Sequence, residues 1–422
     1  MCSRGTLLSD RLLGMAWVVR GEFRKLWVGQ LVSASGSAVT TVALPLVAVV
    51  TLQASAWQMG LLSALTIAPH LVFGLPAGVW VDRWPLRRIL IVTDLGRAVL
   101  LGTIPLAAAT DSLRIEQLYV VAVLTGVLTL LSDTASLTML PSLVPREDLM
   151  RANSAALLNL NLASTTGPSV AGFLVQLVTA PFAILVDAAS YLVAATASYL
   201  IREPVRASAK HARARLTTGL RAIFSDRIMT SLTLSATTAA LAGAMQGPLV
   251  VLYLVRELHW SPGFVGVALT TFGVAAVAGT FVATAWCTLV GIGRAYISGV
   301  LLASVSGVAL ATGVTPMIYL GQALSGLGMS LFGVPQRTLR QSLAPAHQIG
   351  QVTATWRTLV IGGQAAGAAT SGVLATAIGI RPTFLLATGG MLLGVLIALV
   401  SPLRTFRSLP ATDPQPRSMA ED

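Results

Sequence analysis

The stretch Gly78-Val-Trp-Val-Asp82-Arg83-Trp-Pro-Leu-Arg87-Arg88 decides how this 422-residue chain is organised. The residues that lead into it, from Leu61 to Val81, carry no formal charge and would form a helix about 31 Å long, enough to cross a bilayer. The residues that follow it, from Ile89 to Ala109, are almost as apolar. A short loop with one carboxylate and three guanidinium groups between two such runs predicts a hairpin of membrane helices with a cytoplasmic turn.

The composition of the whole chain agrees with a membrane environment. Hydrophobic residues make up 55% of the sequence and charged residues 10%, and the mean hydropathy is +0.78. So few charged side chains cannot cover a soluble protein of this length. The sequence therefore predicts an all-α membrane protein with twelve transmembrane helices of about 22 residues. We expect them near residues 27–51, 60–81, 89–109, 117–140, 153–178, 181–201, 229–254, 262–286, 294–313, 316–335, 352–378 and 382–402.

Basic residues are distributed unevenly around these spans. Of the 28 Lys and Arg residues, 23 fall on the side of the charged turn, three on the other side and two, Arg97 and Arg357, inside spans. Cytoplasmic loops are rich in Lys and Arg, so this asymmetry predicts a multi-pass protein of the cell membrane with both termini in the cytoplasm. The net charge of +12 then reflects topology, and we expect the lipid bilayer as a partner and no nucleic acid.

Motifs for enzymes and metal sites are missing from the sequence. The two cysteines, Cys2 and Cys287, have no metal-ligand spacing. We find no phosphate-binding Gly-Lys-Ser/Thr loop, no His-Glu-x-x-His and no Gly-x-Ser-x-Gly. We therefore expect no enzyme, no cofactor and no metal. The apolar piece from Leu12 to Val19 has no cleavage site after it and is interpreted as an interfacial helix.

The chain repeats itself weakly at an offset of about 200 residues. A shift of 203 places Pro45 on Pro248, and a shift of 200 places Gly172 on Gly372. Such a repeat predicts two six-helix bundles with a substrate site between them near the midplane. The expected parts are a cytoplasmic N-terminal segment (1–25), a first bundle (26–201), a cytoplasmic linker (202–227), a second bundle (228–403) and a cytoplasmic tail (404–422). A short surface helix is expected within the linker, from Leu216 to Phe224.

Several motifs carry a resemblance to a known family. Gly78-x-x-x-Asp82-Arg83 followed by two arginines resembles the loop 2–3 signature of the major facilitator superfamily of secondary transporters, although Pro85 stands where the family has a second glycine. The run from Leu140 to Asn153 resembles the drug-proton antiporter branch, which includes macrolide-efflux-like and siderophore-exporter-like proteins. The resemblance covers nearly the whole chain and implies the major facilitator fold.

One element of span five bears on the direction of transport. Gly167-Pro168-Ser-Val-Ala-Gly172 resembles the Gly-Pro-x-x-Gly-Gly element of the superfamily's antiporters. Small residues let helices approach closely, and Pro168 bends the helix at a contact that must rock. The resemblance implies an antiporter, whereas ordinary packing in a glycine-rich helix is the alternative.

Charged residues within the predicted spans are the candidates for proton coupling or substrate contact. They are Asp94, Arg97, Asp133, Asp187 and Arg357. Each costs about 2.5–3.5 kcal/mol near a helix centre, so such residues usually face the bundle interior. Asp133 has no local partner and is the first choice, since an unpaired carboxylate in this environment can exchange a proton near neutral pH. Asp94 and Arg97 are one turn apart and are also explained by a simple ion pair, and Asp187 by capping of local backbone.

Polar residues in the spans are the candidates for lining a cavity. They are Gln30, Asn159, Asn161, Gln246 and Gln364, together with His70 and Gln322. A single glutamine in a membrane helix more often makes an interhelical hydrogen bond than a ligand contact. The composition predicts an apolar cavity, which favours amphiphilic substrates over sugars or phosphates.

The charged turn is expected to act as a gating motif. Its members are Gly78, Asp82, Arg83, Arg87 and Arg88. The family resemblance implies a cytoplasmic latch between the halves. Because the N-terminal end of a helix carries partial positive charge, we hypothesise that Asp82 docks on that end of span eleven when the cytoplasmic side is closed, with Arg357 as a partner one turn inside. The alternative is a topology anchor without a gating role.

These observations favour a monomeric secondary transporter. We expect it to export drugs or other amphiphilic small molecules by proton antiport with alternating access. Two alternatives stay open, which are an exporter of a siderophore or natural product with the same fold, and a transport-inactive membrane sensor or scaffold.

Overall fold

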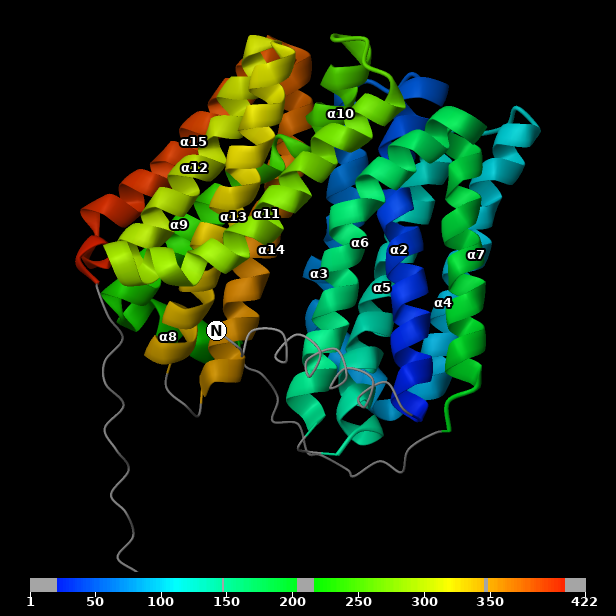
Figure 1. Cartoon of the computed structure of the whole chain (residues 1–422), viewed down its shortest axis with the longest axis horizontal. Helices are drawn as coiled ribbons and strands as arrows, with labels where there is room; N and C mark the ends of the chain where they lie inside the picture. The colour runs from blue at the N-terminus through cyan, green and yellow to red at the C-terminus, as the bar shows by residue number, and fades with distance from the viewer. Residues whose placement is uncertain (1–20, 146–147, 203–215, 345–347, 407–422) are drawn as a thin grey trace, which may run out of the picture.

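Twelve helical segments run alongside one another in two groups in the described part of the chain (Figure 1). The computed structural model describes residues 21–145, 148–202, 216–344 and 348–406. The first group comprises α2 (Glu22–Leu46) with the π-helical turn η1 (Val47–Thr51), α3 (Ala56–Arg83), α4 (Leu86–Ala109), α5 (Ile115–Leu143), α6 (Leu149–Val178) and α7 (Ala180–Tyr199). The second group comprises α9 (Arg227–Ala244) with α10 (Gly247–Arg256), α11 (Pro262–Val290), α12 (Ile292–Thr312), α13 (Thr315–Leu343), α14 (Ile349–Ile378) and α15 (Ile380–Val400). The expected interfacial helix at Leu12 to Val19, the linker from 203 to 215 and the tail from 407 lie outside the described residues.

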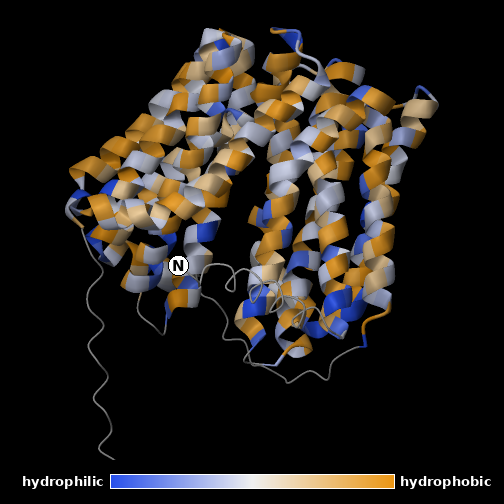
Figure 2. Ribbon diagram, viewed as in Figure 1, coloured by the Kyte–Doolittle hydropathy of each residue, from blue (hydrophilic) through white to orange (hydrophobic). Residues whose placement is uncertain are grey.

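The helices have the length and polarity of membrane spans. Eleven segments of the described chain are long and apolar enough to cross a membrane. The remaining long helix, α6, has 30 residues but carries Arg151 and the asparagines Asn153, Asn159 and Asn161, which lower its hydropathy. Hydrophobic residues are frequent along the helices of both groups (Figure 2). The predicted twelve-helix membrane fold is confirmed.

The two groups are built alike. In the first half α2 packs against α6 and α7, α4 packs against α5 and α7, and α3 packs against α5. In the second half α9 packs against α14 and α15, α12 packs against α13 and α15, and α11 packs against α13. Each helix of the first half thus has a counterpart with the same neighbours in the second, which confirms the two six-helix repeats.

Glycines hold the halves together at one end of the bundle. At the crossing of α6 and α11, a Cβ added to Gly172 would lie 3.0 Å from the Cα of Gly266. At the crossing of α3 and α14, a Cβ added to Gly60 would lie 2.8 Å from the Cα of Gly372. One hydrophobic cluster spans both halves at this end and joins Leu46 of α2 to helix α10. At the other end the first and second halves have separate clusters, so the halves contact each other mainly at one end.

The charged stretch is largely helical rather than a loop. Helix α3 continues through Asp82 to Arg83, and α4 begins at Leu86, so only Trp84 and Pro85 lie between them. A residue before proline is forced away from the helical conformation, and Trp84 accordingly has φ −113° and ψ 151°. The connection is therefore shorter than the predicted turn.

The predicted span from 229 to 254 is interrupted. Helix α9 ends at Ala244 and α10 begins at Gly247, with Pro248 in its first turn. Proline lacks the N–H that would continue the hydrogen bonds of α9, which accounts for the break. Its counterpart in the repeat, Pro45, lies near the end of α2, where the helix changes into the π-helical turn η1.

A short helix, α8 (Leu216–Ser225), lies where the linker was expected to form one. It does not merely lie on the surface, because Gly219 packs against Thr355 of α14 and Ile223 is fully buried. Ile223 belongs to a cluster with Met229 of α9 and Val352 of α14. The second half of the bundle therefore includes α8 at the end where the halves separate.

Candidate functional site

A cavity of about 990 Å³ lies between the two halves. Its wall comes mainly from the middle of α2, the first halves of α6 and α14 and the second halves of α3 and α5, and Arg97 of α4 also contributes to it. These are the parts of the helices beyond the glycine contacts, where the two halves diverge (Figure 1). The glycine crossings thus form the closed end of the cavity, and the end near α8 is the open one.

Hydroxyl groups dominate the polar part of the wall. Four lining residues of α2, Gln30, Ser33, Ser37 and Thr41, are spaced three or four apart and so share one helical face. The Ser and Thr residues that line the cavity are Ser33, Ser37, Thr41, Thr129, Ser132, Thr134, Ser136, Ser164, Thr353 and Thr358. None of the described residues on the wall is Phe, Tyr or Trp. The lining area is mostly apolar, as expected, and these hydrogen-bonding groups form its smaller, polar part.

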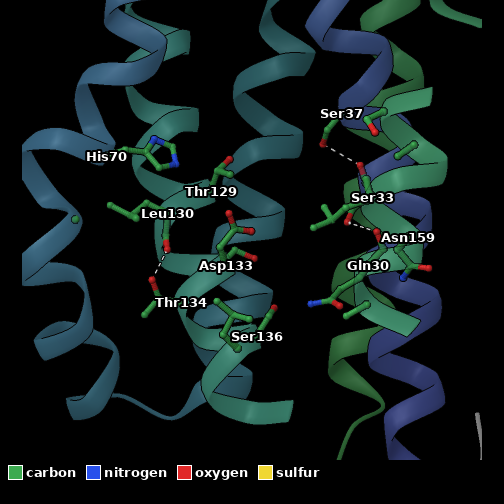
Figure 3. Close-up of a pocket in the computed structure, with 18 of the residues that line it drawn as sticks. Gln30, Ser33, Ser37, His70, Thr129, Leu130, Asp133, Thr134, Ser136 and Asn159 are labelled. Carbon is green, nitrogen blue, oxygen red and sulfur yellow. Dashed lines mark hydrogen bonds between the residues drawn. The ribbon is translucent and has the colours of Figure 1, made fainter. Parts of the chain in front are cut away.

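Asp133 faces the cavity rather than a helix interface. Its side chain is exposed on the wall and lies opposite the α2 and α6 side of the cavity (Figure 3). It interacts electrostatically with His70 of α3, Arg357 of α14 and Arg97 of α4. Asp133 is therefore not the isolated carboxylate that the sequence suggested, because cations from both halves compensate it.

Arg97 forms a buried ion pair with Asp94 one turn earlier on α4. The guanidinium also donates to Ser132 Oγ at 3.1 Å and lies 4.1 Å from the centre of the Tyr191 ring. Asp94 and Arg97 are 4% and 6% exposed. The ion pair foreseen in the sequence is present, and its guanidinium also reaches the cavity wall, which places the pair beside the candidate site.

Asp187 is buried behind the cavity wall, at 1% exposure. Its Oδ1 accepts hydrogen bonds from Ser190 at 3.2 Å and from Ser37 at 3.5 Å. The Ser37 hydroxyl lies 2.7 Å from the Tyr191 hydroxyl and lines the cavity. Asp187 thus accepts from side chains of α2 and α7, which is more than capping of local backbone.

The predicted cavity amides divide into two groups. Gln30 and Asn159 line the cavity, and Asn159 donates to the Trp27 carbonyl at 3.0 Å (Figure 3). Asn161 is exposed on another face of α6, and neither Gln246 nor Gln364 lies on the wall. Gln246 contacts Met391 inside the second half, and Gln322 accepts from Ser306 at 3.0 Å between α12 and α13. For Gln322 the interhelical hydrogen bond was the correct interpretation.

The gating motif lies at the open end. A Cβ added to Gly78 would meet no heavy atom within 4 Å, and Asp82, Arg83 and Arg88 are exposed. Arg87 donates to the Tyr199 carbonyl and lies over the Tyr199 ring, which ties α4 to the end of α7. Arg357, the expected partner of Asp82, faces the cavity and interacts with Asp133 and His70 in this open conformation. The latch therefore stays a prediction about the closed conformation.

The Gly167-Pro168-Gly172 element lies where helices cross. Gly167 packs against Ala38 of α2, and a Cβ added there would lie 2.2 Å from the Ala38 Cβ. Gly172 packs against α11 of the other half, and Ser169 Oγ donates to Thr270 Oγ1 of the same helix at 2.7 Å. The element thus belongs to the contact about which the halves are arranged.

The sequence profile of the transmembrane secretion effector family, a branch of the major facilitator superfamily, matches residues 14–421. This chain belongs to that family. The enterobactin exporter EntS of Escherichia coli O1:K1 / APEC is 25% identical to this transporter in an alignment of 409 positions that covers 92% of this chain and 94% of that protein. The predicted resemblance to the major facilitator superfamily and to siderophore exporters is confirmed, and the similar proteins are transporters rather than enzymes.

Solved structures share the fold at low sequence identity. A bacterial homologue of the iron transporter ferroportin in its inward-facing state has a TM-score of 0.75 and 15% identity, over 90% of this chain and 98% of that one. A bacterial homologue of ferroportin in the outward-facing state has a TM-score of 0.59 and 18% identity, over 90% of this chain and 99% of that one. The arrangement of the two halves is thus closer to the inward-facing structure.

Sequence reasoning missed the hydroxyl face of α2 and the role of Tyr191. The signal for the first was present, because Gln30, Ser33, Ser37 and Thr41 recur at helical spacing within an apolar span. Tyr191 gave no comparable signal, since a lone tyrosine four residues after Asp187 is typical of any packed helix. Its position between Arg97 and Ser37 depends on how α2, α4 and α7 meet.

Proposed function

We propose that this transporter exports a hydrogen-bonding amphiphile of the siderophore or natural-product type from the cytoplasm. The similarity to an enterobactin exporter supports an exported substrate of this class. The excess of Lys and Arg on one side supports an orientation in which the open end of the cavity faces the cytoplasm. The substrate enters there, the halves rock about the glycine crossings, and the cavity opens on the opposite side.

The observation that carries this proposal is the chemistry of the cavity wall. Ten hydroxyl side chains line the cavity, and six of them donate to carbonyl groups of their own helices. Their oxygens can accept hydrogen bonds from a substrate that carries hydroxyl groups, and the guanidinium of Arg357 can donate to carbonyl or acidic groups. Lipophilic cations bind best over aromatic rings, and the described wall has none. The positive charges of Arg357, which is exposed, and of nearby Arg97 also repel a cationic substrate and attract an anionic one. The cavity volume of about 990 Å³ lies near the upper end of the range for small-molecule pockets, so it suits a large substrate.

Uptake into inverted membrane vesicles tests the proposal. We expect saturable uptake of enterobactin, and we expect Arg357→Gln to raise the half-saturating concentration by about 10- to 150-fold, because a charge-assisted hydrogen bond contributes about 1.5–3 kcal/mol. Arg404→Gln is the matched control, since Arg404 is exposed beyond α15 and does not line the cavity. Equal effects of both substitutions, or no uptake, would overturn the assignment.

A second candidate is antiport of drugs against protons. Asp133 favours it, because an acid on the cavity wall can bind a cationic drug and a proton in alternation. The same vesicles distinguish the two candidates with a fluorescent cationic dye, measured with and without a pH gradient. Gradient-dependent dye uptake that is lost in Asp133→Asn would favour drug antiport. If neither compound is taken up, a membrane sensor or scaffold becomes the better explanation.

A further inference from the structure

We infer that Asp187, rather than Asp133, carries the proton that this transporter exchanges for its substrate, and that Ser37 connects it to the cavity. This inference rests on the proposed export function. It concerns which carboxyl group binds and releases the proton. It follows from which positively charged side chains interact with each of three acids of the first half.

The acids Asp94, Asp133 and Asp187 all interact with the same guanidinium, that of Arg97. Arg97 forms its direct ion pair with Asp94, which therefore has a full partner. Asp133 interacts with one further permanent cation, Arg357, as well as with the imidazole of His70, and it faces the cavity. Neither Asp133 nor Asp187 has a direct ion pair among the described residues, but Asp187 is buried and Arg97, which already pairs with Asp94, is the cation it interacts with. Asp187 is therefore the acid for which a proton supplies the missing compensation.

The surroundings of Asp187 reinforce this difference. Helix α2 contributes the Ser37 hydroxyl and the backbone of Gly36, where an added Cβ would lie only 2.8 Å from Asp187 Oδ1. Helix α4 contributes Arg97 with its partner Asp94, and α7 itself contributes Tyr191.

Helix α6 brings no charge to this place, since its single charged residue, Arg151, lies near the helix start and pairs with Asp148 at 3.4 Å. An ionised Asp187 would thus have hydroxyl groups and one shared cation as its support. Because Asp187 is buried away from water, these groups compensate the charge of its carboxylate only weakly. A protonated, neutral carboxyl group needs no such compensation.

A short path joins Asp187 to the cavity. Ser37 lines the cavity, and its hydroxyl donates to the Ser33 carbonyl at 2.8 Å (Figure 3). Ser37 Oγ also lies 3.5 Å from Asp187 Oδ1 and 2.7 Å from the Tyr191 hydroxyl. The proton leaves the carboxyl oxygen of Asp187 for the Ser37 oxygen, while the hydroxyl hydrogen of Ser37 passes to water in the cavity. No bond other than these O–H bonds changes. The Tyr191 ring also lies against the Arg97 guanidinium, so Arg97 is positioned to respond when Asp187 becomes ionised.

Infrared difference spectroscopy of the full chain in lipid nanodiscs tests the inference without a substrate. Between acidic and alkaline buffer we expect a carbonyl band of a protonated carboxyl group to disappear. The band should be absent in Asp187→Asn and retained in the matched acid variant Asp133→Asn. In Ser37→Ala the band should remain, but its shift in heavy water should develop several-fold more slowly. Thermal unfolding of each variant establishes that it is folded.

Three results would overturn the inference. The band could persist in Asp187→Asn and vanish in Asp133→Asn, which would assign the proton to the cavity acid. It could be missing from the unsubstituted protein, which would mean that no carboxyl group is protonated in this range. It could also vanish at fixed pH when sodium replaces choline, which would assign Asp187 to a sodium ion. Because the spectra need no substrate, failed siderophore uptake with a normal band would refute the export proposal alone.

Discussion

The crossing of α6 and α11 is expected to control which end of the transporter is open. Replacing Gly172 by alanine places a Cβ 2.5 Å from the Pro262 carbonyl oxygen and 3.0 Å from the Cα of Gly266. An ordinary contact of a Cβ begins at 3.4 Å, so the two helices must separate at the closed end. Forcing extra volume into a packed contact costs about 1–3 kcal/mol. This cost falls on the present conformation, in which the contact is made, and changes the ratio of the two conformations by about 5- to 150-fold.

Electron–electron double resonance measures that ratio directly. The native Cys2 and Cys287 are first replaced by serine, and spin labels are attached to cysteines at Trp84, which is 64% exposed at the end of α3, and at Ile349, where α14 begins. These positions lie on opposite sides of the open end, in different halves. In Gly172→Ala the population with the shorter distance should grow by the stated factor.

Gly102→Ala is the matched control for this experiment. Gly102 also lies within a membrane helix, but a Cβ added there meets no heavy atom within 4 Å. Its substitution should leave the distance distribution unchanged. The reasoning is refuted if Gly172→Ala leaves the two populations as they were, or if both variants shift them equally.

Three further predictions concern other parts of the molecule. Arg97→Gln leaves Asp94 buried without its partner, so it should destabilise the protein by about 3–5 kcal/mol in thermal or denaturant unfolding, and adding Asp94→Asn should restore most of the loss. Ile223→Ala should loosen α8 at a cost of about 2–5 kcal/mol and speed trypsin cleavage at Arg221, whereas Phe224→Ala, at a position 51% exposed, should not. Asp82→Asn should reduce transport by about 5-fold or more at normal expression, whereas Asp111→Asn in the loop at the other end should not; intact transport in Asp82→Asn would rule out the latch.

The fold was predictable because the bilayer imposes a simple rule on it. Every apolar run long enough to cross had to be a helix, since unpaired backbone groups are too costly in lipid. The break at Met245 and Gln246 was missed for a related reason, because 229–254 is one continuous apolar run whose only interrupting signal is Pro248. Prolines at Pro69, Pro105 and Pro168 leave their helices continuous, so a proline alone does not predict a break.

The candidate site was predictable in its residues but not in their orientation. Five charged residues of the membrane helices were singled out from the sequence, since charged residues are rare in spans, whereas Arg340, buried near the end of α13, was not. Their orientation was not, because hydropathy alone does not tell a cavity wall from a contact between helices. The sequence predicts an Asp133 without a partner and a Gln246 that lines the cavity, whereas in the structure Asp133 interacts with Arg357 of α14 and Gln246 contacts Met391 away from the cavity.

The two repeats differ in the side chains around the buried charges of the first half. With the offset of 200 residues, Arg97 corresponds to Ile297, Asp187 to Ala387 and Tyr191 to Met391. A duplicated ancestor that kept the acids and the guanidinium in both copies would have met the insertion cost of about 2.5–3.5 kcal/mol per charge twice. A copy without these charges inserts into the membrane at a lower cost. The second half, away from the cavity residues of α14, is consequently the better place to graft tags or fluorophores without disturbing the buried charges of the first half.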